Sequence, residues 1–413
     1  MRTIPSRPVR DACKVNAERV IADLRELDRL TGGPAGARRV CWTDAWEHAR
    51  AFLRERLAEL PVAVDVDEAG NLWAELAGEG DAVVVVGSHL DSVPNGGWLD
   101  GALGVFAALE VLRAAGERPP VTLRLVDWAD EEGRFGRSLF GSSAATGTLD
   151  VAAVRDLRDR DGVRLEDGVG IELDRAGEAR SRLQAVRAYL ELHIEQGPVL
   201  ESKDEPAAAV LGTCGVERHV VVFTGQTVHA GATPMAMRRD SFAAAAQAAL
   251  AIAQIGSEHD GVCTVGGATS EPGIPTAVAG RTEMLLDQRH LDPEKLAAML
   301  AAARDASRQA AADHGCEVEL QPTWSIPPVP FDERLITVAR EAVGKDLAIP
   351  SGPLHDASEL ARVVPTVMLF AKSSPPVSHT KEEDTPEPDL RVAIQAYGRT
   401  VARAMGLVAA GEL

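Results

Sequence analysis

A strand-helix-strand succession in the first third of the chain constrains the fold more than any other feature. The apolar segment at residues 82–88 predicts a buried strand, residues 101–115 have the apolar spacing of a helix, and residues 121–128 predict a second strand. A helix that connects two strands in this way makes them parallel neighbours in an α/β sheet. Ligand sites in such sheets lie beyond the carboxyl ends of the strands. The residues that follow each strand are therefore the first candidates for a functional site.

The length of the chain favours more than one domain. With 413 residues it exceeds the usual size of a single core. The α/β pattern is interrupted at residues 214–324, where the order β-α-β-β-α-β is typical of a ferredoxin-like domain. In that region we expect strands at 219–225, 262–268, 281–289 and 316–322 and helices at 236–256 and 292–313. A proline-rich joint at residues 322–331 then returns the chain to the α/β pattern.

The sequence thus predicts two domains, one of which is split. Residues 1–213 and 325–413 form an α/β domain with a mixed, mostly parallel sheet flanked by helices, and residues 214–324 form an inserted domain. Outside the crossover, the α/β domain is expected to contain strands at 61–66, 71–76, 188–200 and 364–370 and helices at 15–31, 43–60, 333–344 and 388–408. Residues 150–185 are rich in charge and glycine and have no strong period, so no elements are predicted there.

The charge balance excludes several classes of partner. The chain has 43 Lys and Arg against 62 Asp and Glu, a formal net charge of -19, which would repel nucleic acid and anionic membranes. We expect a small-molecule substrate instead. The five cysteines are scattered without a CxxC pair, which favours reduced thiols and a cytoplasmic location. The sequence contains neither a signal peptide nor an apolar run of about 20 residues, the length of a membrane span.

The first strand of the crossover ends in a histidine and an aspartate. His89 and Asp91 are two residues apart, so their side chains lean to the same side and the carboxylate can accept the second imidazole N–H. Such a bond fixes the tautomer that binds a metal. Asp100 lies in a glycine-framed turn and could bridge two metals with its two oxygens. Taken singly, each residue is better explained by a structural role, His89 as a core histidine and Asp100 as the N-cap of the following helix.

Three further strand ends carry metal-ligand types, and together they outweigh these structural roles. The second crossover strand is followed by Glu131 and Glu132, of which one can bind metal and the other can take a proton from water. A third strand contains His193, and a fourth leads into a loop with His379. Imidazole and carboxylate ligands without thiolate predict two divalent metal ions per subunit, zinc first, with manganese, cobalt or nickel as alternatives.

The motifs around these residues resemble one enzyme family. They are GSHLDSV, GGWLDGALGV, DEEGRFG, ELHIEQGPVLE, HAGATPM, DQRHLD, SGPLHDA and VSHTKEE, in this order along the chain. Together they are similar to zinc-dependent amidohydrolases that include N-carbamoyl-L-amino acid hydrolases, allantoate amidohydrolases and β-ureidopropionases, a branch also described as hydantoinase/carbamoylase. The resemblance implies a dimetal aminopeptidase-like fold whose inserted ferredoxin-like domain serves as a dimerisation and lid domain.

The resemblance also implies a role for each candidate residue of the α/β domain. The metal ligands would be His89, Asp100, Glu132, His193 and His379. Asp100 would bridge the two metals, Glu131 would be the general base, and Asp91 would orient His89. Two cations about 3.5 to 4 Å apart would then activate water and polarise the scissile carbonyl.

The inserted domain supplies further residues of the family pattern. His229 resembles a histidine that reaches the active site of a neighbouring subunit and stabilises the oxyanion, which implies a homodimer built through the insert. Arg289 resembles an arginine that grips the substrate carboxylate. Without the resemblance, a surface ion pair of Arg289 with Asp287 or Asp292 is the expectation.

The sequence departs from the family pattern around the expected substrate. Gln196 and His355 match positions that contact substrate, but Thr276 stands where an asparagine usually helps to hold the substrate carboxylate. The other departures are Pro353 and Leu354 in SGPLHDA, Pro375 and Pro376 in KSSPPVSH, and a loop after Glu132 that is one residue short. The metal-ligand positions are intact, so we predict retained amide hydrolysis on a bulkier or less ordinary substrate.

Three hypotheses for the function follow. The leading one is a dimetal hydrolase that cleaves a non-peptide C–N bond of an N-carbamoyl (ureido) amino acid or a related linear amide. The second is an aminoacylase or peptidase-like hydrolase of an ordinary N-acyl amide. The third is a non-catalytic binding relic, against which the intact pair Glu131 and Glu132 argues.

Overall fold

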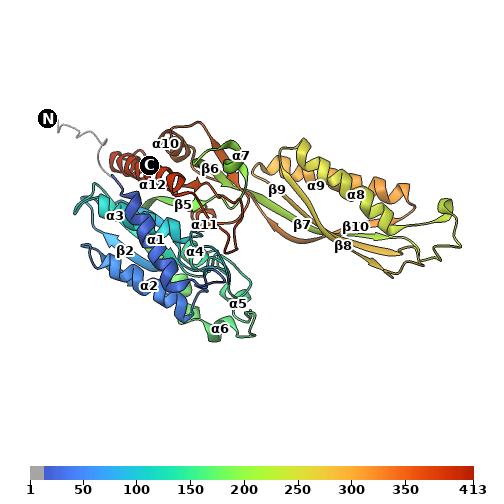
Figure 1. The fold of residues 1–413 in the computed structure, drawn as a ribbon, viewed down its shortest axis with the longest axis horizontal. Helices are drawn as coiled ribbons and strands as arrows, with labels where there is room; N and C mark the ends of the chain where they lie inside the picture. The colour runs from blue at the N-terminus through green and yellow to red at the C-terminus, as the bar shows by residue number, and fades with distance from the viewer. Residues whose placement is uncertain (1–13) are drawn as a thin grey trace. The chain divides into compact units, whose positions relative to one another are not determined.

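The chain forms two compact units (Figure 1). The computed structural model describes residues 14–413, so Cys13 lies outside the described residues. The main unit comprises the described residues up to Gly212 together with Phe331–Leu413, and the insert unit is Thr213–Pro330. The insert unit ends six residues beyond the predicted boundary at residue 324. This difference arises because strand β10 (Glu317–Ile326) is longer than predicted.

The main unit is built on a nine-stranded mixed sheet. Its strands are β1 (Ala63–Val66), β2 (Leu72–Leu76), β3 (Val83–His89), β4 (Thr122–Trp128), β5 (Val186–Ile194), β6 (Ala207–Thr213), β12 (Ala348–Ser351) and β13 (Thr366–Ala371), together with β11 (Val329–Pro330), the last two residues of the segment assigned above to the insert unit. They follow in the order β1-β2-β4-β3-β5-β13-β6-β11, with β12 beside β6. The central pairs β3–β4, β3–β5 and β5–β13 are parallel, whereas β1–β2, β2–β4 and β13–β6 are antiparallel. The predicted mixed sheet with a parallel centre is confirmed.

Helices flank this sheet. They are α1 (Ala17–Thr31), α2 (Asp44–Leu57), α3 (Ala102–Ala114), α4 (Phe140–Thr146), α5 (Val151–Val154), α6 (Leu165–Gly168), α7 (Val199–Lys203), α10 (Glu333–Val343), α11 (Asp356–Leu360) and α12 (Glu387–Ala410), with the 3-10 segment η2 (Leu173–Leu183). The crossover helix α3 is buried from Ala102 to Leu112, because it packs against β3 and β5 and is itself covered by α1 and α12. Among residues 14–413, no helix is both long and apolar enough to cross a membrane.

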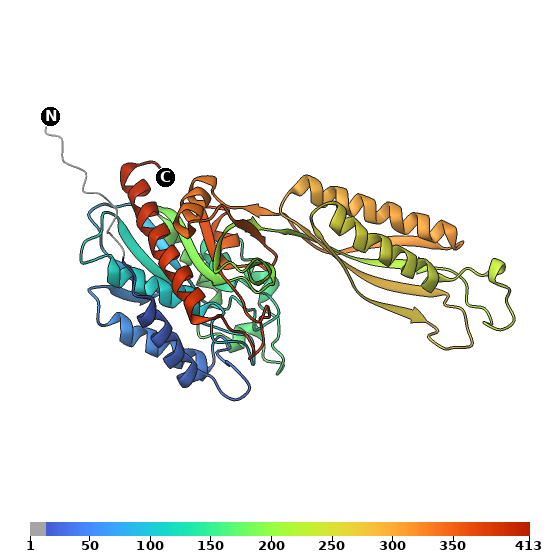
Figure 2. The same ribbon diagram turned by 45° about the horizontal axis from the view of Figure 1, so that its top comes forward.

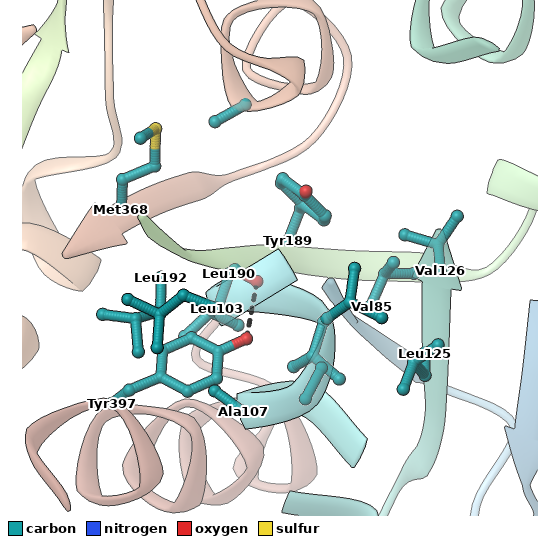
Figure 3. Close-up of a cluster of buried hydrophobic side chains, with 14 of the residues drawn as sticks. Val85, Leu103, Ala107, Leu125, Val126, Tyr189, Leu190, Leu192, Met368 and Tyr397 are labelled. Atoms are coloured by element: carbon teal, nitrogen blue, oxygen red, sulfur yellow. Dashed lines mark hydrogen bonds between the residues drawn. The ribbon is translucent and has the colours of Figure 1, made fainter. Parts of the chain in front are cut away.

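The core of the main unit shows how β5 divides its side chains between two faces (Figure 3). Leu190 and Leu192 face α3 and α12, and the Tyr397 hydroxyl of α12 donates to the backbone oxygen of Leu190 at 2.9 Å. Tyr189 points to the opposite face. Because successive strand side chains alternate, His193 shares the face of Tyr189. One face of β5 is thus purely apolar, and the other carries polar groups toward the strand end.

The insert unit has the predicted ferredoxin-like order. Its elements are β7 (Gly215–Thr224), η3 (Met235–Met237), α8 (Ser241–Glu258), β8 (Val262–Glu271), β9 (Arg281–His290), α9 (Pro293–Asp313) and β10. The strands are antiparallel in the order β10-β7-β9-β8, and α8 and α9 lie side by side over one face of the sheet (Figure 2). Met284 and Leu286 of β9 face this helical layer, whereas Leu285 between them is 55% exposed.

Two sequence-based assignments need correction. The helix predicted at 236–256 begins at Ser241, because the Asp240 side chain caps it by accepting the backbone N–H groups of Phe242 and Ala243. Strand β6 was not predicted, since its first residues are alanines, which have a low strand propensity. Its pairing with β13 supplies the stability that propensity does not.

Candidate metal centre

The carboxyl ends of parallel strands bring the predicted ligands together. β3 ends at His89, and β4 is followed by Glu131 and Glu132. His193 is the last residue but one of β5, and His379 lies in the loop after β13. Because β4, β3, β5 and β13 are successive parallel neighbours, these residues meet at one edge of the sheet.

Asp100 divides these side chains into two groups of candidate metal ligands. Its Oδ1 lies 3.1 Å from His193 Nε2 and 3.8 Å from His89 Nε2. Its Oδ2 lies 3.5 Å from His379 Nε2, and that nitrogen is 3.4 Å from Glu132 Oε2. Within each of the two groups, the ligand atoms all lie within 4.8 Å of one another. Each group therefore faces a different oxygen of one carboxylate, which is the arrangement of a bridging ligand.

The hydrogen bonds of two histidines leave their ligand nitrogens available for a metal. His89 Nδ1 lies 3.1 Å from the backbone oxygen of Asp91, and His193 Nδ1 lies 2.9 Å from that of Ile194. These contacts place a proton on each Nδ1, so Nε2 is the nitrogen that each ring presents to the carboxylates and that binds a metal once it carries no proton. His193 Nε2 is buried, has no hydrogen-bond partner among the described residues, and faces an oxygen of Asp100. A cation between these two lone pairs removes their repulsion, so the residues fit a divalent metal.

Asp100 is held by side chains from other segments and does not cap the helix that follows it. The N-cap of α3 is Gly101, and Asp100 Oδ2 accepts from Gln196 Nε2 at 3.0 Å and lies 3.1 Å from Ser378 Oγ. Gly101 has φ +64°, and a Cβ at this position would lie 2.4 Å from His89 Cε1. Glycine is therefore required where the turn passes the histidine ring.

Asp91 ties the residues after β4 to the end of β3. Its carboxylate accepts the backbone N–H groups of Glu131 at 3.4 Å and of Glu132 at 3.2 Å. Its Oδ1 is 3.5 Å from His89 Nδ1, farther than its backbone oxygen. The main chain of Asp91 thus makes the closer contact with His89, and its side chain sets the positions of the two glutamates. Glu131 Oε2 then lies 3.8 Å from His89 Nε2, on the ligand side of the ring.

Burial concentrates negative charge at this edge of the sheet. Burial and neighbouring carboxylates raise the pKa of both Glu131 and Glu132 well above the usual value. Burial alone would lower the pKa of His89, but Glu131, Asp91 and Asp100 together raise it well above the usual range. For Asp100, nearby imidazoles outweigh burial and lower the pKa. Carboxylates that lie close together resist ionisation because their negative charges repel one another. Bound cations would stabilise the ionised form.

Gln196 lies at the centre, beside the bridging carboxylate. Its Nε2 donates to Asp100 Oδ2 and, at 3.1 Å, to Ser378 Oγ. Its Oε1 is buried without a hydrogen-bond partner among the described residues. The side chain predicted to contact substrate therefore has one amide end occupied and a carbonyl oxygen still able to accept a hydrogen bond.

His355 lies behind the ligand histidine of β5. Its ring centroid is 4.4 Å from that of His193, its side chain is 2% exposed, and its Nε2 is 3.0 Å from Ser351 Oγ. Burial first, and then the neighbouring His193, lower the pKa of His355 well below the usual value, so the ring is neutral. A third group of candidate ligands combines His355 and His193 with Glu191, but the Glu191 carboxylate already accepts three hydrogen bonds.

The insert residues singled out from the sequence lie at two separate places of the insert unit. His229 and Thr276 are in adjacent segments, since the backbone N–H of Ala230 donates to the Thr276 oxygen at 2.9 Å. Arg289 lies near the end of β9, and its Nε donates to Asp287 Oδ1 at 2.8 Å. The ion pair expected without the family resemblance is therefore present.

Glu383 was not singled out from the sequence although it contacts the centre directly. Its side chain is 1% exposed, and it accepts hydrogen bonds from the backbone of Asp100 and from the Ser378 hydroxyl. The segment KEED, in which it stands, resembles a charged surface loop, and no periodicity marks one of its acids as buried. Only its spacing of four residues from His379 could have pointed to it.

The fold and the ligand groups together define an aminopeptidase-like α/β hydrolase with an inserted domain. The sequence profile described as Peptidase family M20/M25/M40 matches residues 85–403. The chain belongs to this family.

Characterised relatives align with almost the whole chain. N-carbamoyl-L-amino acid amidohydrolase from Geobacillus stearothermophilus is 35% identical over 403 residues, which cover 94% of this chain and 98% of the relative. Allantoate amidohydrolase from Bacillus subtilis (strain 168) is 31% identical over 402 residues, with 93% and 97% covered. A crystal structure of a hydantoinase/carbamoylase family amidase from Burkholderia multivorans has a TM-score of 0.83 at 33% identity, with 95% of this chain and 97% of that chain covered. The predicted family is confirmed, and the chain is an enzyme of the amidohydrolase type.

Proposed function

We propose that the protein is a dimetal amidohydrolase that cleaves a non-peptide C–N bond of an N-carbamoyl (ureido) amino acid or a related linear amide. The observation that carries this proposal is the sharing of Asp100 between two ligand groups, with Glu131 beside them. The names of the relatives, an N-carbamoyl-L-amino acid amidohydrolase and an allantoate amidohydrolase, support the same class of bond.

The proposed cofactor is a pair of divalent metal ions, zinc first, with manganese, cobalt or nickel as alternatives. One ion would be held by His89, Asp100 and His193, and the other by Asp100, Glu132 and His379. Nitrogen and oxygen ligands without thiolate suit these metals. When bound, the pair would polarise the scissile carbonyl and lower the pKa of water to about 7.

Glu131 is the proposed general base. The hydrogen bond from its backbone N–H to Asp91 fixes its position, and its carboxylate lies on the ligand side of the His89 ring. It takes one proton from the water whose oxygen bonds to the carbonyl carbon. It then passes that proton to the leaving nitrogen, so that the C–N bond breaks with a neutral amine as leaving group.

His229 is the proposed donor to the oxyanion. Its side chain is exposed, and its Nδ1 accepts the backbone N–H groups of Gly231 at 3.1 Å and Ala232 at 3.2 Å. These two contacts assign the imidazole proton to Nε2. An imidazole with its Nε2–H directed away from these contacts can donate a hydrogen bond to negative charge that develops on the carbonyl oxygen.

The positions of the insert residues favour active sites that are shared between two subunits. Arg289 and the His229 loop are separated by most of β9, roughly 26 Å at about 3.3 Å per residue, which is too far for one insert to place both on a small substrate. Arg289 pairs in register with Val216 of β7. We therefore propose that Arg289 binds the substrate carboxylate at one site of a dimer and that His229 of the same insert acts at the other site. This assignment requires a homodimer built through the insert.

The substrate pocket is proposed to differ from that of ordinary carbamoyl amino acid hydrolases. Thr276 lies beside the His229 segment and offers one hydroxyl where the family pattern has an amide. Pro353 packs close to His355, since the Ser351 hydroxyl that contacts His355 also donates to the Pro353 oxygen at 2.9 Å. A pocket with one fewer partner for the carboxylate should bind N-carbamoyl-glycine and N-carbamoyl-alanine weakly.

Ammonia release tests this function. Metal-loaded protein is incubated with a panel of N-carbamoyl amino acids of increasing side-chain size and with allantoate, with and without prior chelation. We expect ammonia that disappears on chelation and returns with zinc or manganese. If the loaded protein instead releases carboxylate from N-acyl amino acids and no ammonia from any ureido compound, the aminoacylase hypothesis replaces the proposal. Loaded protein that cleaves neither class would fit a binding relic.

The proposed compartment is the cytoplasm. The described cysteines, Cys41, Cys214, Cys263 and Cys316, are free thiols. Free thiols are the usual state of cysteine in a reducing compartment.

A further inference from the structure

We propose that Glu383 is a positioning residue that keeps one oxygen of Asp100 available to the metal group completed by Glu132 and His379. This inference rests on the proposed dimetal site. It concerns a residue that does not itself lie within reach of a ligand position in either group.

Glu383 first fixes the turn that carries Asp100. Its Oε1 accepts the backbone N–H of Asp100 at 3.0 Å and that of Leu99 at 3.3 Å. A Cβ at Gly97 would lie 2.2 Å from the same oxygen, so the turn passes the buried carboxylate too closely for any side chain at this position. The backbone that precedes α3 is therefore built around Glu383.

The second carboxylate oxygen of Glu383 accepts the hydroxyl proton of Ser378. Glu383 Oε2 lies 2.7 Å from Ser378 Oγ, and the same hydroxyl lies 3.1 Å from Asp100 Oδ2. A serine hydroxyl has one proton to donate, and the shorter contact with a carboxylate takes it. The Gln196 amide donates to the Ser378 oxygen, which favours this direction. Glu383 thus draws the hydroxyl proton away from Asp100 Oδ2.

The direction of the Ser378 hydroxyl affects one of the two candidate ligand groups and not the other. Asp100 Oδ2 faces His379, whereas Oδ1 faces His193 and His89 on the other side. A hydroxyl proton that turned to Oδ2 would compete with a metal for its lone pair. We call the ion proposed to be held by Asp100, Glu132 and His379 the second ion. Loss of Glu383 should therefore weaken the binding of the second ion more than that of the other ion.

Replacement of Glu383 by glutamine reverses the direction of this hydrogen bond while the size of the side chain is kept. The Gln amide oxygen can still accept from Asp100 and Leu99, but its NH2 group donates to Ser378 Oγ. The Ser378 proton is then free to turn to Asp100 Oδ2. Removal of the hydroxyl in the double variant Glu383→Gln/Ser378→Ala eliminates that competitor, so it should restore retention of the second ion.

A matched control lies next to Glu383 in the chain. Asp384 accepts the indole N–H of Trp98 at 3.1 Å and so braces the same loop, but it does not contact Asp100. Asp384→Ala should lower the thermal stability and leave both ions in place. A general loosening of the loop is thereby distinguished from the specific effect on Asp100.

The experiment counts zinc ions per subunit in the full-length protein after dialysis against a graded chelator series, with thermal unfolding followed in parallel. We expect the wild type to retain two ions and Glu383→Gln to lose one ion at a chelator concentration at least tenfold lower. The double variant should recover chelator resistance. Equal loss of both ions, retention of both at wild-type resistance, or no recovery in the double variant would overturn the inference.

Two further outcomes remain informative. If Glu383→Gln does not fold, Ser378→Ala alone carries the test: unchanged chelator resistance supports proton control, and a tenfold loss contradicts it. If the wild-type protein itself never binds two ions, the dimetal proposal fails together with this inference. Failure of ammonia release from protein that does bind two ions would leave the role of Glu383 standing.

Discussion

The two sheets of the molecule differ in how far their faces are covered. The parallel centre of the main sheet is buried on both faces, and the polar residues it carries are concentrated at strand ends, where His89 and His193 are each 1% exposed. The insert sheet has one face covered by helices and one open, and its candidate functional residue His229 is exposed. The side chains of a buried site are positioned by the unit that contains them. An exposed residue can act on a substrate only when another protein surface holds that substrate beside it. The comparison predicts that activity and stability respond differently to changes in the two units.

The largest expected effect is the loss of activity when Glu131 is replaced. Glu131→Gln removes the proton acceptor but keeps the size of the side chain, so turnover should fall by about 10²- to 10⁴-fold, the range for general-base catalysis. Metal content should stay at two ions per subunit, because Glu131 belongs to neither ligand group. Ammonia release and elemental analysis of the same sample measure both quantities. A variant that remains fully active would remove Glu131 from the role of base.

The exposed counterpart of this experiment is His229→Ala. Removal of one oxyanion donor should lower turnover by about 10²- to 10³-fold, with no change in thermal unfolding because the side chain is exposed. His259→Ala, at the C-terminal end of α8 in the same unit, is the matched control and should leave turnover unchanged. Equal effects of the two replacements would argue against a specific role for His229.

Mixing these two variants tests whether sites are shared. In a mixed dimer of Glu131→Gln and His229→Ala subunits, one of the two shared sites contains both native residues. Activity should therefore reappear on mixing, although each parent is impaired. The absence of recovery in dimers shown to be mixed would mean that each chain supplies its own His229.

Chelation should destabilise the main unit and spare the insert unit. Ions that bind only the folded state stabilise it by RT ln(1 + [L]/Kd), about 2.7 kcal/mol at 100 times Kd. Both ligand groups lie in the main unit, so amide hydrogen exchange should accelerate near β3, β4 and β5 after chelation. Exchange in β9 should not change. Acceleration of equal size in both units would contradict the assignment of the ions to the main unit.

The smallest effects should appear where no chemistry is involved. Tyr397→Phe leaves the buried oxygen of Leu190 without its donor and should cost about 1 to 3 kcal/mol of unfolding free energy with turnover unchanged. Leu285→Ala on the open face of the insert sheet should change the unfolding free energy of the monomer by less than about 0.5 kcal/mol. Chemical denaturation measures both. If Leu285→Ala costs as much as Tyr397→Phe, the open face is covered in solution.

Much of the candidate metal centre could be predicted from the sequence because its candidate ligands follow recognisable strands. His89, Glu132 and His193 stand at or just beyond the ends of apolar segments, and the crossover between the first two strands fixed their parallel direction. The helical and strand periods of the insert were equally clear, and the structure has the predicted element order. Local pattern and overall topology agree in these regions.

The remaining features depend on contacts between distant segments, which no local pattern reveals. Glu383 lies 283 positions from the Asp100 backbone it holds, and the two residues before it, Lys381 and Glu382, are charged and exposed. The closer approach of the Asp91 main chain to His89 results from the turn geometry after β3. Arg289 and the His229 segment lie near opposite ends of β9, and the motifs alone do not reveal this separation.

Stepwise return of metal to chelated wild-type protein is the decisive measurement. Ammonia release from the best ureido substrate is recorded as zinc or manganese is added in fractions of one equivalent per subunit. The proposed centre predicts that activity is absent without metal and reaches its maximum only when the second equivalent is bound, because Asp100 serves both ligand groups. Full activity in metal-free protein, or a maximum already reached at one equivalent, would contradict a two-metal mechanism.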